Sequence, residues 1–245
     1  MKDLWKYVII AVAVIVSAVV LAIAYTQHSR TSTGVITVTG LGETEFTSDV
    51  IIINGYIETT HEDAAEAYRI LGDHRAAVIA FLNERGVATD ELSFAMISTS
   101  KRWESQYDNG KYQGEIFAGY QLLQSFTIES SNIDGVESAA RELPSLMTED
   151  IAITVHDPLY FFSQLESVKL DLIAAAAADA RERAEKIASS SGSSLGDLSS
   201  SRAGVFQITA ATGDEEFSAG GSFNLSSRDK KARVTVRSEF YIKEK

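Results

Sequence analysis

The alternation of apolar and polar residues predicts strands and helices in a mixed order. Single-residue alternation at 36–40 and a β-branched run at 49–59 predict two strands. Thr59 and Glu62 have the spacing of a capping box, so we expect a helix to start there and to end at Gly86. The residues expected on its inward face are Ala64, Tyr68, Leu71, Val78 and Leu82.

A long hairpin is predicted next, from strands at 92–107 and 112–130. Asn109 and Gly110 lie between them and supply the positive φ angles of a tight turn. Five aromatic residues crowd the two strands: Trp103, Tyr107, Tyr112, Phe117 and Tyr120. Two interpretations stay open, because alternate aromatic side chains pack inward or the hairpin presents them to a neighbouring subunit.

The second half of the chain alternates helices with strands. Strands are predicted at 150–157 and 204–210, and a loop rich in Gly and Ser at 211–227 leads to a regularly alternating last strand. A short helix precedes the first of these strands, and a long helix at 161–189 follows it. The inward residues expected on the two helices are Ile133, Val136, Ala140, Leu143, Leu165, Val168, Leu172, Ala176, Ala180, Ala184 and Ile187.

This order of elements distinguishes between fold classes. It contains too many hairpins for a doubly wound parallel sheet. The sequence therefore predicts an α+β fold in which helices pack against antiparallel sheet, and we expect residues 34–245 to form it.

The N-terminal segment carries a different signal. Residues 7–25 are apolar and uncharged, and a helix of that length spans about 28 Å, enough for a bilayer core. Lys2 and Lys6 favour a cytoplasmic location for residues 1–6, so a linker at 26–33 leads to a domain in the periplasm or exterior. The alternative is a signal peptide cleaved near Ala24, which exports the same domain.

Composition excludes several functions. The chain has 22 basic and 34 acidic residues and a net charge of −12, which disfavours binding of nucleic acid or docking on anionic lipid. It has no Cys, which excludes disulfides, thiol nucleophiles and Cys-zinc sites. No two of the four His residues show metal-ligand spacing, so we expect neither a metal nor a cofactor.

Gly40 and Gly42 resemble the start of a dinucleotide fingerprint. That motif requires a third glycine and a following helix, whereas Glu45 stands at the third position and a strand follows. We interpret the two glycines as part of a turn or a bulge.

Ser194 lies in a G-x-S-x-G motif between Gly192 and Gly196. The nucleophile elbow of hydrolases places such a serine above a helix N-terminus. Here a helix ends, and the negative end of its dipole is wrong for an oxyanion. We interpret the segment as a turn after the helix, and a hydrolase using Ser194 stays as the enzymatic alternative.

With these residues in view, the chain resembles the SIMPL-domain family of exported bacterial proteins, which includes periplasmic immunogenic proteins. The stretches that carry the resemblance are 36–68, 97–129 and 155–198, with a V-x-G-x-G strand, Gly119-Tyr120, Asp157-Pro158 and the Asp179-Ala180-Arg181 segment. The resemblance implies an envelope location, an α+β fold and, in some relatives, assembly into rings. It implies no catalytic residue.

We therefore expect a non-enzymatic, membrane-anchored envelope protein that forms a homo-oligomer as an interaction or structural module, with a ring as the expected form. The expected interface consists of Trp103, Tyr107, Tyr112, Phe117 and Tyr120. The alternatives are the hydrolase using Ser194 and a module that binds a small-molecule ligand, which would need an apolar pocket with convergent polar groups.

Overall fold

The computed structural model describes residues 12, 14–23, 34–212, 218 and 220–243. The chain forms the predicted α+β fold with antiparallel sheets, and it divides into two compact units. The hairpin unit contains residues 44–169 and 207–232, and the α4 unit contains residues 1–43, 170–206 and 233–245.

The N-terminal prediction falls mostly outside the described residues. Residues 14–23 are helical, but 1–6, the two ends of the expected anchor (7–11 and 24–25), residue 13 and the linker at 26–33 are not described. Within the described part of the chain, no helix is long and apolar enough to cross a membrane. The anchor therefore stays a prediction.

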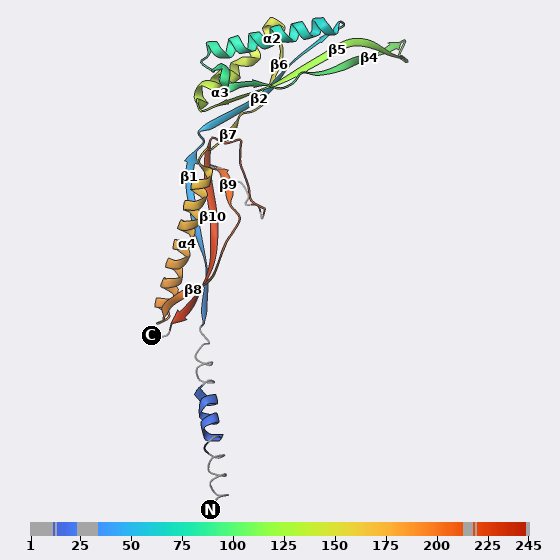
Figure 1. Ribbon diagram of the computed structural model, residues 1–245. Coiled ribbons are helices and arrows are strands. Elements are labelled where there is room, and N and C mark those ends of the chain that lie inside the picture. Colours follow the sequence, from blue (N-terminus) through green and yellow to red (C-terminus); the bar gives the residue numbers. More distant parts are fainter. Residues whose placement is uncertain (1–11, 13, 24–33, 213–217, 219, 244–245) are drawn as a thin grey trace, which may run out of the picture. The chain divides into compact units, whose positions relative to one another are not determined.

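A six-stranded antiparallel sheet forms the centre of the hairpin unit (Figure 1). Its main path runs β3 (Leu92–Phe94), β5 (Lys111–Ser130), β2 (Val50–His61), β6 (Ala152–Val155), while β4 (Ser98–Asp108) also pairs with β5 and β7 (Leu159–Phe161) with β2. The longest register of β2 runs along β5, from Ile51 opposite Ser130 to His61 opposite Tyr120. The predicted hairpin is thus confirmed, with its first strand divided into β3 and β4.

Helices α2 (Ala64–Glu84) and α3 (Ile133–Glu142) complete the core of this unit, with 3-10 turns at Thr89–Glu91 and Leu143–Glu149. On α3 and the turn that follows, all four predicted inward residues are buried. On α2, Leu71, Val78 and Leu82 are buried as predicted, but Ala67 replaces Ala64, and Tyr68 is 61% exposed.

The start of α2 also differs from the prediction. Thr59 belongs to β2, which continues to His61, so Thr59 and Glu62 form no capping box. The helix cap is Asp63, whose carboxylate accepts hydrogen bonds from the amides of Ala65 and Glu66 at 2.8 and 3.0 Å. The pairing of β2 with β5 determines where β2 ends and α2 begins. The spacing of Thr59 and Glu62 in the sequence did not reveal this boundary.

The second sheet has the order β1 (Val35–Thr47), β10 (Asp229–Lys243), β8 (Ser194–Ala203), with β9 (Gln207–Ala210) also paired to β10. Helix α4 (Leu165–Ser190) buries its alanine stripe as predicted, at Ala176, Ala180 and Ala184, although Ile187 is 47% exposed. The turn predicted after the helix is present at Ser191 and Gly192, but the segment from Ser194 onward forms β8 along the regular strand β10. Pairing with β10 outweighs its low intrinsic strand preference.

Gly40 and Gly42 lie inside β1 and not at a turn. A Cβ added to Gly40 would stand 2.1 Å from the Ala176 carbonyl oxygen, and one added to Gly42 would stand 2.2 Å from the Leu172 carbonyl oxygen. The two glycines therefore allow the backbone of α4 to approach the sheet. No phosphate-binding loop is present here, since β2 follows β1.

Candidate functional site

The most exposed element of the hairpin unit is its two-stranded arm, which we define as residues 98–120 of β4 and β5 (Figure 1). Every residue of β4 is exposed. Asn109 and Gly110 have φ angles of 49° and 79° and form the predicted turn. Only β5 of the described strands pairs with β4, so this strand has a free edge.

The strand register places all five candidate aromatic residues on one face of the arm. Trp103 lies opposite Phe117, and Tyr107 lies opposite Tyr112. Directly opposite residues share a face, as do residues two or four apart on a strand. Tyr120 lies opposite Lys101, two residues before Trp103, and so belongs to the same face.

The rings contact one another in pairs along this aromatic face. The ring centroids of Trp103 and Phe117 are 5.7 Å apart, as are those of Tyr107 and Tyr112. Phe117 and Tyr120 are 5.1 Å apart. All three pairs are edge-on, a favourable arrangement for aromatic rings.

Inward packing of these side chains, one of the two open interpretations, is wrong for four of the five. Trp103, Tyr107, Tyr112 and Phe117 are 54%, 67%, 53% and 39% exposed. Tyr120 is partly buried and packs against the hydrophobic core. The exposure of these side chains does not test the second interpretation, in which the hairpin contacts a neighbouring subunit. That contact stays a prediction.

The opposite face of the arm is mostly polar, with one exposed apolar side chain, Ile116, opposite Glu104. Arg102, Glu104, Gln106 and Asp108 lie there, and Arg102 forms an ion pair with Glu104 at 3.7 Å. The arm as a whole contains three basic residues (Lys101, Arg102, Lys111) and three acidic ones (Glu104, Asp108, Glu115), so its net charge is zero. The arm therefore has no net charge, although the chain is strongly acidic. One of its faces carries the aromatic residues and the other is mostly polar.

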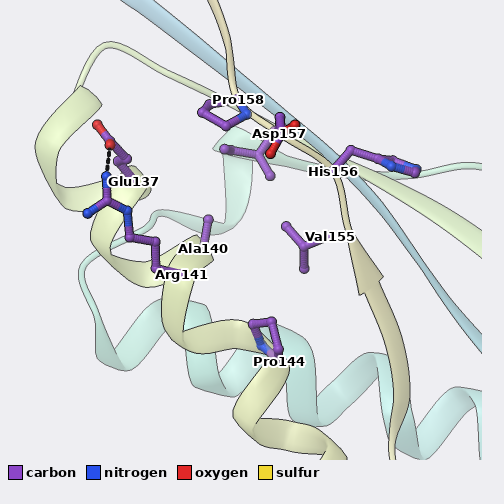
Figure 2. A pocket seen from close by; sticks show the side chains of 9 residues that line it. Glu137, Ala140, Arg141, Pro144, Val155, His156, Asp157 and Pro158 are labelled. Atoms are coloured by element: carbon purple, nitrogen blue, oxygen red, sulfur yellow. Dashed lines mark hydrogen bonds and ion pairs between the residues drawn. The ribbon is translucent and has the colours of Figure 1, made fainter. Parts of the chain in front are cut away.

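A separate pocket of about 350 Å³ lies in the hairpin unit, between α3 and the end of β6 (Figure 2). Ala140, Pro144 and Val155 supply an apolar wall, and Glu137 and Arg141 form an ion pair at one side. This arrangement has the apolar lining of a ligand pocket. Glu137 and Arg141 neutralise each other, and Asp157 adds one further carboxylate to the lining.

The pocket lacks the geometry of an acid–base site. The His156 amide donates to the Asn54 carbonyl oxygen at 2.8 Å, and its ring is directed away from Glu137 and Arg141 (Figure 2). Burial, with the neighbouring Glu137 carboxylate, raises the pKa of Tyr160, so its hydroxyl stays protonated at neutral pH. No group of three or more metal-ligating side chains occurs among the described residues.

Ser194 shows no nucleophile geometry either. Its hydroxyl donates to the Lys243 carbonyl oxygen at 3.1 Å, a contact between the paired ends of β8 and β10. Within the described part of the chain, no histidine hydrogen-bonds to Ser194. His61 instead accepts from the Asp63 amide at 3.0 Å, next to the cap of α2.

One polar contact was missed by the sequence analysis. Asp179 and Arg183 on α4 form an ion pair at 2.8 Å. The same carboxylate oxygen also accepts a hydrogen bond from the Leu41 amide on β1 at 2.8 Å. This bond, followed by the one from Arg183, lowers the pKa of Asp179 below its ordinary value.

Comparison with protein families matches residues 36–240 to SIMPL, described as "Protein of unknown function (DUF541)". The chain belongs to the SIMPL family. The resemblance inferred from the V-x-G-x-G strand and the following segments is therefore confirmed. Comparison with curated proteins found no match.

Solved structures add only weak likenesses to this SIMPL protein. One is an amidase of the hydantoinase/carbamoylase family from Burkholderia phymatum, with 11% identity, a TM-score of 0.26, and coverage of 56% of this chain and 35% of that chain. Another, described as an amidohydrolase/peptidase from Burkholderia cenocepacia, has 10% identity, a TM-score of 0.20, and coverage of 54% and 32%. The match spans about a third of each of these structures, and at such TM-scores neither carries an argument about activity.

Proposed function

We propose that this SIMPL protein is a non-enzymatic module of the cell envelope that is anchored by residues 7–25 and assembles with copies of itself through the arm. The observation that carries the proposal is the aromatic face, where two exposed ring pairs, Trp103 with Phe117 and Tyr107 with Tyr112, flank the pair Ser105 and Glu115. Soluble domains rarely expose a contiguous aromatic patch unless it contacts a partner.

The proposed occupant of this face is the aromatic face of a second arm. A two-fold contact requires a surface that complements itself, and paired aromatic rings meet this requirement. The arm carries no net charge, so two copies can approach through it although each chain carries −12. A shared membrane anchor would also confine the copies to two dimensions and raise their effective concentration.

The two-fold contact alone forms pairs. The ring expected from the family resemblance would additionally need a contact between unlike surfaces. The free edge of β4 offers unpaired backbone groups for such a contact.

Sedimentation of the full chain in detergent tests the proposal. Changing Trp103→Ser and Tyr107→Ser should produce smaller species with an unchanged melting temperature, because both side chains are exposed. The matched control changes Glu104→Ser and Gln106→Ser on the polar face of the same strand and should leave the assembly intact. A wild-type protein that sediments as one chain per micelle at high micromolar concentration would overturn the proposal.

Two further measurements separate this proposal from others. If the aromatic face inserts into lipid instead, residues 34–245 without the anchor should bind phosphatidylcholine vesicles, and Trp103→Ser with Tyr107→Ser should abolish this binding while the assembly is unchanged. Protease added to spheroplasts should digest residues 34–245, and complete protection would contradict the proposed orientation.

A further inference from the structure

Two arginines face each other on the sheet of β1, β10 and β8. One face of this sheet packs on α4, where Val38 and Phe240 contact Ala180 and Ala184. The other face carries exposed polar side chains of β10, because burial alternates along that strand. Arg237 on β10 lies on this open face, directly opposite Arg202 on β8, and both are exposed.

This juxtaposition is unfavourable by itself. Like charges directly opposite each other on neighbouring strands repel. The described part of the chain offers neither guanidinium a hydrogen bond or an ion pair, although acidic residues outnumber basic ones by 34 to 22. By contrast, Arg233 on the same strand forms an ion pair with Glu43 at 3.2 Å.

The two arginines line a groove of about 220 Å³ together with Ser200, Ser201 and Glu239. The Ser200 hydroxyl donates to the Glu239 carboxylate at 3.1 Å, and the hydroxyl of Ser201 is 3.1 Å from that of Ser238. With two guanidinium groups and one carboxylate, the lining carries a net charge of +1. The groove is therefore positive on a chain of net charge −12.

We propose that Arg202 and Arg237 form a binding site for a tetrahedral oxyanion, either free phosphate or sulfate or the phosphate ester of a lipid headgroup. A guanidinium group offers a planar fork of N–H donors that matches two oxygens of such an anion. Two forks on opposite strands can hold one anion, which removes the repulsion between them. The Glu239 carboxylate in the same groove limits affinity and disfavours larger polyanions.

Thermal unfolding of the full chain in a nonionic detergent tests this site. Sodium phosphate should raise the melting temperature by about 2–4 °C more than sodium chloride of equal ionic strength. A variant with Arg202→Gln and Arg237→Gln should lose this difference, and its affinity for inorganic phosphate by calorimetry should fall at least about tenfold. The Arg75→Gln variant is the matched control, since Arg75 is an exposed arginine on α2, and it should keep the full response.

A second measurement separates a binding site for phosphate from two solvated arginines that bind no ligand. In phosphate-free buffer, Arg237→Gln alone should raise the melting temperature, because it removes the like-charge contact. Phosphatidylglycerol added to the detergent micelles should displace bound phosphate if the site takes a lipid headgroup, and it should leave the phosphate bound if the site takes free oxyanion. An equal response to phosphate in the wild type and the double variant, or no preference for phosphate over chloride, would overturn the proposal.

Discussion

Phe117 and Tyr120 are three residues apart on β5, yet their rings lie 5.1 Å apart on the same face of the arm. Strict alternation would place them on opposite faces. The register shifts by one residue here, since Arg102 pairs with Gly119 while Trp103 pairs with Phe117 and leaves Ala118 unpaired. This bulge brings the two rings to the same side.

A second bulge does the same for Tyr112. Gln106 pairs with Gly114 and Tyr107 pairs with Tyr112, so Gln113 is left unpaired. A glycine adjoins each bulge, and Gly114 and Gly119 have φ angles of 124° and 119°, a conformation that other residues rarely adopt. The two glycines thus permit all five rings to lie on one face, which the sequence spacing alone would divide between two faces.

Replacing Gly119 with alanine should therefore lower stability. The φ angle of 119° at this position is strained for any residue with a side chain. The added Cβ would also stand 2.7 Å from the His61 carbonyl oxygen. We expect a loss of about 2–4 kcal/mol in the free energy of unfolding, measured by chemical denaturation. Gly72→Ala in α2 is the control, because nothing lies within 4 Å of the added Cβ, and it should stabilise by about 0.5–1 kcal/mol. Equal effects of the two changes would contradict this account.

Replacing Gly40 with alanine should lower stability at the other sheet. The Cβ would overlap the backbone of α4 at the Ala176 carbonyl oxygen, so helix and strand must separate. The expected cost is about 3 kcal/mol or more in the free energy of unfolding. Thr39→Ala, an exposed neighbour on β1, should change stability by less than about 1 kcal/mol. A Gly40→Ala variant as stable as the Thr39→Ala variant would show that α4 does not pack as described.

Features set by neighbouring residues in the chain were predictable from the sequence. The turn at Asn109 and Gly110 depends on local φ preferences, and the alanine stripe of α4 on helical periodicity. The five aromatic residues were also found, because their density in one hairpin is visible in the sequence.

Features that depend on pairing between distant segments were not predictable in the same way. Because β2 extends to His61, the cap of α2 is Asp63 and not Thr59. Because the serine-rich segment after α4 pairs with β10, it forms the strand β8. The single aromatic face depends on bulges opposite β4, for which Gly114 and Gly119 in a strand interior were the available signal. The opposition of Arg202 and Arg237 requires the register of two strands whose spacing in the sequence gives no hint of it.

Replacing Ser194 with alanine should leave both fold and function unchanged. Its hydroxyl makes one exposed hydrogen bond to the Lys243 carbonyl oxygen, and such a contact is worth about 1 kcal/mol or less. Thermal unfolding and the sedimentation profile of the variant should match those of the wild type. A large loss of function at an unchanged melting temperature would instead revive the hydrolase.

Replacing Asp179 with asparagine should reduce the loss of stability in acid. The hydrogen bond from the Leu41 amide, then the Arg183 side chain, lowers the pKa of Asp179 below its usual 3.8. A carboxyl group whose pKa is lower when folded contributes stability above its unfolded pKa, and this contribution disappears as pH falls through the folded value. Between pH 6 and pH 3, the melting temperature of Asp179→Asn should therefore fall less than that of the wild type.

The comparison isolates one carboxyl group among several. Arg69 lowers the pKa of Glu66, and Arg228 lowers that of Asp134, so the wild-type curve contains their contributions as well. These are unchanged in the variant, and the difference between the two curves reports Asp179 alone. Asp171→Asn, an exposed carboxylate on the same helix with no hydrogen-bond partner in the described part of the chain, should reproduce the wild-type curve. Parallel curves for Asp179→Asn and the wild type would show that the bond between α4 and β1 does not persist in solution.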